Sequence, residues 1–161
     1  EFHNQHPLKG LSKLKERVSE MGFLSKPEIK QLLNNLSGDE LHIAKLCLST
    51  GARWTEAADL RGSDIVHGRV TFSDTKNGKN RTVPITSKLM SEIHHGKSRR
   101  LFKGSYAKFY SVLKEQEFDL PKGQAAHVLR HTFASHFMMN GGNILTLPKI
   151  LGHSTITQTK N

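Results

Sequence analysis

Apolar residues in the first part of the chain recur at intervals of three and four, which is the spacing of one helix face. The first series follows Ser25-Lys-Pro-Glu28, a capping box with proline in the first turn, and stops at Gly38. A second series opens at Asp39 and closes at Gly51. The apolar positions of these two predicted helices are Ile29, Leu32, Leu33 and Leu36, then Leu41, Ile43, Ala44, Cys47 and Leu48.

After a short helix predicted at about 55–60, the pattern changes from the period of helices to that of strands. Three short runs, 65–66, 70–72 and 81–85, are separated by turns at 67–68 and 76–80. Pro84 suits the edge of a sheet, because proline cannot donate a hydrogen bond to a neighbouring strand. The pattern predicts one small antiparallel sheet of three strands.

Helical spacing returns at about 87–94, 106–116 and 124–140, and once more at 143–151, where Pro148 is expected to kink or shorten the helix. The fold class is therefore α+β, mostly helical, with one small antiparallel sheet.

The 124–140 helix carries two patterns of side chains, counted at about 100° per residue. Arg130 lies between the two sectors, at the edge of the buried one, where a guanidinium needs an anionic partner. The predicted buried stripe consists of Ala126, Leu129, Phe133 and Phe137, and the other sector of His127, His131, Ala134 and Met138.

The charge of the chain indicates which class of molecule it binds. The 161 residues include 24 Lys and Arg against 14 Asp and Glu, a net charge of +10. Acidic residues are concentrated before Asp74, and none follows Asp119. This balance indicates a polyanion such as double-stranded DNA, although a solvated basic surface is the simpler alternative. The expected DNA-binding residues are Lys79, Arg81, Lys97, Arg99, Arg100 and Lys103.

Composition also excludes several classes of protein. The single cysteine, Cys47, cannot form an internal disulfide and is expected to be a core residue. No stretch approaches the roughly 18 apolar residues of a membrane helix, so no membrane partner is expected. The length corresponds to one domain or to a fragment of a larger protein.

One pair on the 124–140 helix carries candidate chemistry. His127 and Arg130 are three residues apart and can reach the same object, and an imidazole with a guanidinium fork suits a phosphodiester. The alternative is that Arg130 pairs with a carboxylate. His127 and His131 also have the spacing of metal ligands, but no acidic or cysteine ligand follows them, so no metal or other cofactor is expected.

The His-x-x-Arg pair does not stand alone. Arg53 follows a predicted helix that ends in glycine, and Glu56 lies three residues after it. Lys76 lies in the predicted hairpin, and a Gly-His motif contains His153. In this order and at these separations, the motifs resemble the catalytic domain of tyrosine recombinases, the phage-integrase family. The segment 127–142 is particularly similar to integrases of temperate phages of enterobacteria. The resemblance extends from about Leu24 to the last residue and implies the tyrosine-recombinase catalytic fold.

The resemblance implies a role for each matching residue. Two arginines of the family grip the scissile phosphate, a hairpin lysine protonates the leaving 5′-oxygen, and two histidines assist proton transfer and hold the phosphate or the nucleophile. A glutamate supports the site, and a second histidine of the His-x-x-Arg helix orients its neighbours. In this sequence the matching residues are Arg53 and Arg130, Lys76, His127 and His153, Glu56, and His131. The implied function is site-specific DNA recombination, in phage integration and excision, through a 3′-phosphotyrosine.

The resemblance also implies a tyrosine nine residues after the Gly-His motif, at position 162, whereas the sequence ends at Asn161. Tyr106 and Tyr110 lie outside the motif and are expected to pack or to contact DNA. We therefore expect the chain to be inactive in cleavage, with 1–20 a cloning scar and linker and 21–161 a catalytic domain truncated before the nucleophile.

The expected setting follows from the same resemblance: a monomeric fragment of a parent that is tetrameric on DNA, in the cytoplasm of a bacterial host. Two alternatives stay open. One is a DNA-binding module without catalysis, and the other is a transposon or resolvase-type recombinase.

Overall fold

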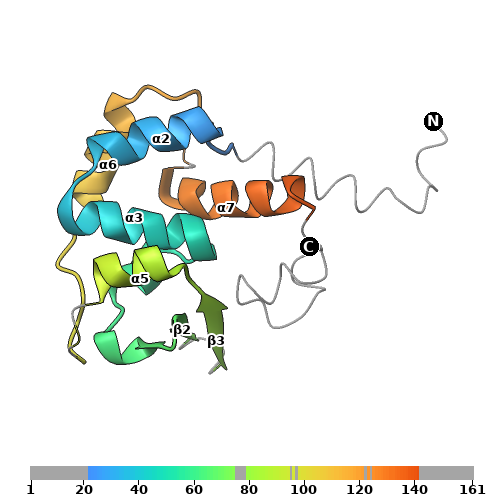
Figure 1. The fold of residues 1–161 in the computed structure, drawn as a ribbon. Coiled ribbons are helices and arrows are strands. Elements are labelled where there is room, and N and C mark those ends of the chain that lie inside the picture. The colour runs from blue at the N-terminus through green and yellow to red at the C-terminus, as the bar shows by residue number, and fades with distance from the viewer. Residues whose placement is uncertain are drawn as a thin grey trace.

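Helices make up most of the structure, and a small sheet lies at one end of the molecule (Figure 1). The computed structural model describes residues 22–74, 79–94, 96, 98–121, 123 and 125–141. The helices are α2 (Lys26–Asn35), α3 (Gly38–Thr50), α4 (Trp54–Ala58), α5 (Ser87–Ile93), α6 (Tyr106–Glu115) and α7 (Val128–Met139), with short 3₁₀ turns η2 (Gly62–Asp64) and η3 (Ala125–His127). No helix of the described part is long and apolar enough to cross a membrane.

The predicted three-stranded sheet is confirmed. Strands β1 (Ile65–Val66), β2 (Arg69–Asp74) and β3 (Lys79–Pro84) are antiparallel neighbours in the order β1-β2-β3. The β1–β2 turn uses His67 and Gly68, both with positive φ, as the tight hairpins favoured by strand twist require. β3 is an edge strand, which accommodates Pro84 as expected.

The predicted N-terminal helices are confirmed, but the boundary between them is corrected. Helix α2 ends at Asn35, and Gly38, which we expected to end it, is the first residue of α3. Ser25 and Glu28 form a reciprocal capping box at the start of α2, where the backbone N–H of Ser25 donates to Glu28 at 2.8 Å. At the end of α3, Gly51 has φ 76°, a left-handed conformation that glycine adopts without strain. The predicted helices at 87–94 and 106–116 are also present, as α5 and α6.

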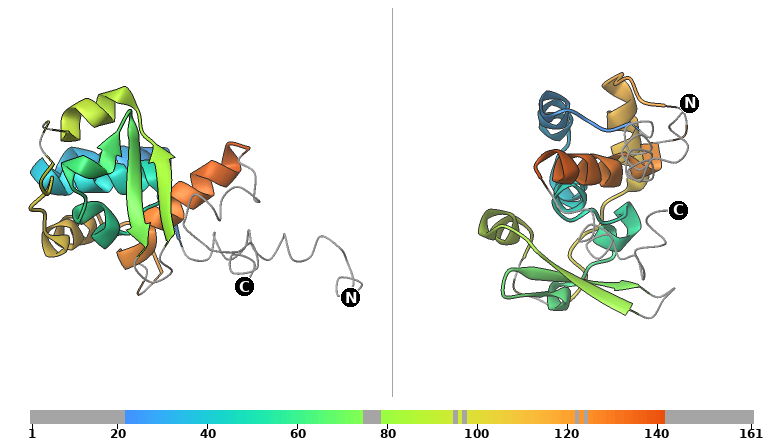
Figure 2. Two further views of the ribbon diagram at one scale, coloured as in Figure 1. Left: turned by 90° about the horizontal axis from the view of Figure 1, so that it is seen from below. Right: turned by 90° about the vertical axis from the view of Figure 1, so that its right-hand side faces the viewer.

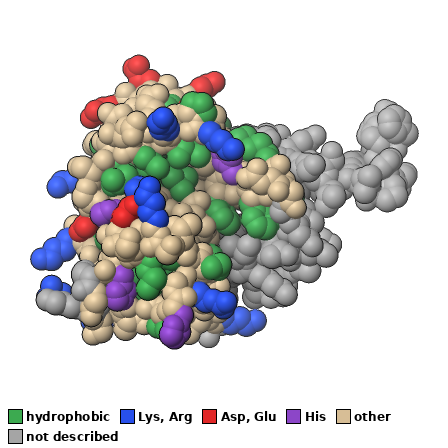
Figure 3. All heavy atoms as spheres, in the orientation of Figure 1, with side chains coloured by type: hydrophobic (Ala, Val, Ile, Leu, Met, Phe, Trp, Pro, Cys, Tyr) green, Lys and Arg blue, Asp and Glu red, His purple; other side chains and the backbone are tan. Residues whose placement is uncertain are grey.

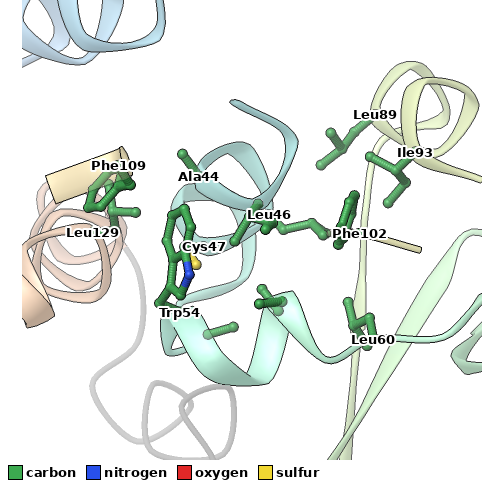
Figure 4. Close-up of a cluster of buried hydrophobic side chains, with 14 of the residues drawn as sticks. Ala44, Leu46, Cys47, Trp54, Leu60, Leu89, Ile93, Phe102, Phe109 and Leu129 are labelled. Carbon is green, nitrogen blue, oxygen red and sulfur yellow. The ribbon is translucent and has the colours of Figure 1, made fainter. Parts of the chain in front are cut away.

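Helix α3 is the centre of the molecule, in contact with α2, α4, α5, α6 and α7 (Figure 2). The core fills the space around it. In Figure 4, Phe109 and Leu129 lie to one side of α3, while Leu89, Ile93 and Phe102 lie to the other. Cys47 is fully buried within this core, and burial raises the pKa of its thiol far above the usual value. The cysteine is a core residue, as the sequence predicted.

The predicted buried stripe on the last described helix is partly wrong. Leu129 is buried, but Phe133 and Phe137 are only half-buried and form a separate cluster with Ala134 and Met138. The helix instead buries Val128 and two polar residues, Thr132 and Ser135.

The physical reason lies in the entering chain. The backbone N–H of Leu24 donates to the Thr132 hydroxyl at 3.0 Å, and the carbonyl of Leu24 lies 2.8 Å from the His136 ring. These contacts turn a polar face of α7 inward. The helix predicted at 143–151 lies outside the described residues.

Candidate active site

Arg53 is placed by the end of α3 and the start of α4. It follows Gly51 and Ala52 and is the residue that precedes α4, and its backbone N–H donates to Glu56 Oε1 at 2.8 Å. This hydrogen bond is half of a capping box and fixes the carboxylate one turn into the helix. The Arg53 guanidinium is 52% exposed, and its Nη1 lies 3.8 Å from Glu56 Oε2. The side chain is therefore oriented toward Glu56 but accessible to a ligand.

Arg130 reaches the same carboxylate from α7. Its side chain is 10% exposed, and Nη1 lies 4.0 Å from Glu56 Oε1. The same nitrogen donates a hydrogen bond of 2.9 Å to the carbonyl oxygen of Gly51. The structure thus brings Arg53 and Arg130 together around Glu56, although the two arginines are far apart in the sequence.

A third arginine completes the cluster. Arg81, on β3, donates to both oxygens of Glu56, from Nη2 to Oε1 at 2.9 Å and from Nη1 to Oε2 at 3.1 Å. Its guanidinium also lies over the Phe72 ring, 4.8 Å from the centroid. Only 9% of the side chain is exposed. We expected Arg81 to be a surface contact to DNA, and the structure corrects this placement because the side chain is turned inward onto Glu56.

The sequence contained a signal for the inward position of Arg81. Val83 is buried, and residues two apart on a strand share a face, so Arg81 faces the core as well. Across the sheet, Val83 pairs with Val70 and Arg81 with Phe72, and both β2 partners are buried. Strand alternation could therefore have identified Arg81 as a member of the site.

The charges in the cluster perturb one another. Three guanidinium groups lie within 4.0 Å of one carboxylate, so positive side chains outnumber the negative one in this group of four. Burial alone would raise the pKa of Glu56, but the hydrogen bonds from Arg81 and from the Arg53 backbone, with the charges of Arg81 and Arg130, lower it below the usual value. Burial, then repulsion from Arg53, lowers the pKa of Arg130 to about 10, so this guanidinium is still charged at neutral pH.

The histidines lie at the beginning of α7. His127 is exposed and immediately precedes the helix, and His131 follows one turn later, with the two rings 5.9 Å apart. An exposed imidazole at a helix N-terminus is accessible to an anionic ligand. Among the described residues, no group of three or more His, Cys, Asp or Glu side chains is arranged to hold a metal ion.

The two tyrosines are on α6 and belong to an aromatic cluster. Tyr106 packs edge-on against Trp54 at 5.8 Å and stacks with Tyr110 at 6.2 Å. Partial burial, followed by the proximity of Tyr110, raises the pKa of Tyr106. The ring contacts agree with a packing role for both tyrosines.

The remaining expected residues fall into two groups. Lys76, His153 and Lys97 lie outside the described residues. The others are on the surface: Lys79, Arg99 and Lys103 are exposed, and the exposed Arg100 forms an ion pair with Asp59 at 3.1 Å. On the face drawn in Figure 3, Lys and Arg side chains are spread widely, while several acidic side chains gather at its upper edge, over α2 and α6.

Known proteins contain closely similar sequences. The chain matches the Phage integrase family over residues 22–161. It is 51% identical over 159 residues to the integrase of Escherichia phage P2, covering 98% of this chain and 47% of that protein. The integrase of Haemophilus phage HP1 is 49% identical over 159 residues, with 96% and 47% covered. This chain therefore spans about half the length of these relatives.

The fold agrees with the sequence comparison. The solved catalytic domain of bacteriophage HP1 integrase superimposes with a TM-score of 0.79 at 49% identity, covering 87% of this chain and 85% of that domain. The family match, over residues 22–161, includes Arg53, Glu56 and Arg130. The chain belongs to the phage integrase family.

Proposed function

We propose that this chain is the catalytic part of a site-specific DNA recombinase, and that its arginine cluster holds the phosphodiester at which a DNA strand is cut and rejoined. The observation that carries the proposal is the convergence of Arg53 and Arg130 on one carboxylate, at 3.8 and 4.0 Å. Relatives named integrases, 51% and 49% identical to this chain, support this function.

The two arginines have complementary properties for binding a phosphate. Arg130 is buried and fixed by the Gly51 carbonyl, so its position is set before the substrate arrives. Arg53 is half-exposed and can close on a phosphate from the solvent side. Attack on a phosphodiester builds negative charge on the equatorial oxygens, and fixed cations lower the barrier by stabilising that charge. A planar guanidinium fork can contact two of these oxygens at once.

Other residues supply the proton transfers in this proposal. Lys76 protonates the leaving 5′-oxygen, while His127 and His153 assist proton transfer and hold the phosphate. A tyrosine that follows His153 attacks the phosphorus, and its phenolic oxygen replaces the 5′-oxygen of the DNA. The 3′-phosphotyrosine keeps the energy of the broken bond, so a 5′-hydroxyl can reverse the reaction without ATP. The cationic charge comes from protein side chains, and the mechanism uses no cofactor.

The proposed partner is double-stranded DNA, inside the bacterial host cell. The phosphate backbone of the DNA is proposed to be contacted by the exposed Lys79, Arg99 and Lys103. Lys97, which lies outside the described residues, is proposed to make the same kind of contact. Such contacts fix the position of a duplex but do not read its sequence. The 161-residue chain is proposed to be a monomer, and the intact recombinase a tetramer on two DNA sites.

The test uses the intact recombinase and a nicked duplex that carries its recombination site. Cleavage next to the nick releases a short strand, which traps the covalent intermediate. We expect a DNA–protein adduct that maps by mass spectrometry to a tyrosine after His153. Specific binding of the intact protein without any adduct would favour a non-catalytic DNA-binding module, and an adduct at Tyr106 or Tyr110 would place the nucleophile elsewhere.

A further inference from the structure

Arg81 lies in the same cluster as Arg53 and Arg130, yet its guanidinium fork faces the Glu56 carboxylate instead of the solvent. We infer that Arg81 is a positioning residue, which keeps the Glu56 carboxylate from forming close ion pairs with Arg53 and Arg130. This inference rests on the proposed function of those two arginines as the phosphate clamp. It assigns to Arg81 a role distinct from contact with DNA.

The distances around Glu56 separate Arg81 from the other two arginines. Both carboxylate oxygens accept hydrogen bonds from Arg81, at 2.9 and 3.1 Å. The guanidinium nitrogens of Arg53 and Arg130 lie at 3.8 and 4.0 Å, beyond hydrogen-bond distance. Arg81 is thus the side chain that binds both oxygens, and Oε1 also accepts the Arg53 backbone N–H at 2.8 Å. The guanidinium groups of Arg53 and Arg130 stay close to the carboxylate without a hydrogen bond to it.

Three features favour Arg81 in this competition. Its planar fork contacts both oxygens of the carboxylate at once, the strongest geometry for this type of ion pair. The guanidinium lies over Phe72, the residue opposite it in the sheet, which holds it in one orientation. Only 9% of the Arg81 side chain is exposed, so water screens the Arg81–Glu56 pair much less than the pair that the half-exposed Arg53 forms with Glu56.

Carboxylates and phosphates compete for the same guanidinium forks. If Arg81 were removed, Glu56 would lose two of its three short hydrogen bonds and keep the one from the Arg53 backbone N–H, while still lying within 4.0 Å of the Arg53 and Arg130 guanidinium groups. The carboxylate, still held at Oε1, would then turn toward the guanidinium groups of these arginines and occupy donors that the phosphate needs. Arg81 therefore serves phosphate binding without contacting the phosphate.

The experiment measures phosphate binding by the 161-residue chain. Inorganic phosphate is titrated while the side-chain Nε–Hε NMR signals of Arg53 and Arg130, assigned from Lys variants, report occupancy. In Arg81→Met we expect affinity to fall about tenfold or more, the effect of one charged hydrogen bond. In Arg81→Met/Glu56→Gln, which removes the competing carboxylate, most of this loss should be recovered. Arg81→Lys, which keeps the charge but loses the fork, should be intermediate.

Two comparisons separate a positioning role of Arg81 from a general effect of its charge and from packing. Arg69→Met removes one exposed charge from β2 of the same sheet and should leave phosphate affinity nearly unchanged. If Arg81 only supports packing over Phe72, the double variant will bind as weakly as Arg81→Met, and the inference is wrong. Full affinity in Arg81→Met, or wild-type affinity in Arg81→Lys, would also overturn it.

The same titration distinguishes this inference from the proposed function. If phosphate shifts neither the Arg53 nor the Arg130 signal in the unmodified chain, the phosphate clamp itself is wrong. If phosphate shifts both signals and Arg81→Met binds as well as the unmodified chain, the clamp stands and the positioning role of Arg81 fails. Thermal melts of every variant verify that the fold is present in each titration.

Discussion

Gly51 and Arg130 are joined by a hydrogen bond of 2.9 Å, in which the guanidinium of α7 donates to the carbonyl oxygen at the end of α3. The carbonyl is held there because Gly51 ends the helix in the left-handed conformation, with φ 76°. Two residues later the chain reaches Arg53. One glycine therefore ends a helix, anchors one arginine and leads directly to the other.

Replacement of Gly51 by alanine tests this arrangement. A Cβ at this φ is strained, so Gly51→Ala should lower the free energy of unfolding by about 1–2 kcal/mol. The strain should also move the carbonyl and perturb the Arg130 Nε–Hε signal. Gly68→Ala is the matched control, because Gly68 has φ 75° in the β1–β2 turn with open space around it. It should lose similar stability and leave the Arg130 signal unchanged. Equal effects of both variants on Arg130 would contradict the account.

The ion pairs of Glu56 predict a dependence of stability on pH. The pKa of Glu56 is lower in the folded chain than its ordinary value of 4.5. The carboxylate therefore stabilises the fold fully above that ordinary value, and this contribution is lost as the pH falls through the lowered pKa. At neutral pH, Glu56→Gln should be about 2 kcal/mol or more less stable than the unmodified chain. Melting curves from about pH 7 to about pH 3 should show that the difference in stability between the two chains becomes smaller on acidification. A difference independent of pH would argue against an ionised Glu56.

The attachment of the entering chain to α7 is tested at Thr132. Its hydroxyl accepts a hydrogen bond from the backbone N–H of Leu24, and both residues are fully buried. Thr132→Val keeps the shape but leaves that N–H without an acceptor, at a cost of about 1–3 kcal/mol. Thr132→Ser keeps the hydroxyl and should lose only about 1 kcal/mol for the missing methyl group. Denaturant unfolding measures both variants. A serine variant less stable than the valine variant would show that the hydrogen bond contributes little to the stability of the fold.

The helices and the sheet were predictable because their signals are local. The capping box at Ser25, the glycine after α3 and the switch to a two-residue period all lie within a few residues of the structure they define. The buried face of α7 was not predictable in the same way. A hydrophobic count favoured Phe133 and Phe137, but a hydrogen bond from the distant Leu24 decided that Thr132 faces inward. Only tertiary structure contains that partner.

The site was predictable to a similar extent. The motifs identified Arg53, Glu56 and Arg130 as members of one site, and the structure brings these three side chains together. The charge pattern alone misplaced Arg81, because an arginine on a basic stretch of sequence resembles a surface residue. Its inward position follows from strand alternation and from the carboxylate that it meets. The positions of Lys76 and His153 stay predictions, since both lie outside the described residues.

Adjacent arginines in the loop before α6 allow a test of the DNA-binding surface. The 161-residue chain should bind duplex DNA with steep salt dependence, because each phosphate contact releases counterions. Arg99→Ala should reduce the slope of log affinity against log salt by about 1 if Arg99 contacts a phosphate. Arg100→Ala should change it less, because Arg100 is already paired with Asp59. Binding titrations at several salt concentrations measure the slopes. A larger effect at Arg100 than at Arg99 would contradict this assignment.

The central claim is that Arg53 and Arg130 grip one phosphate, and a double-variant cycle of strand cleavage tests it most directly. In the intact recombinase, Arg53→Lys and Arg130→Lys should each slow cleavage of the nicked duplex by about a hundredfold or more, because lysine keeps the charge but loses the fork. Groups that act as a unit on one transition state show strongly non-additive losses. The double variant should therefore be much faster than the product of the two losses predicts, with thermal melts unchanged throughout. Full cleavage by either single variant, or losses that simply multiply, would contradict a shared phosphate.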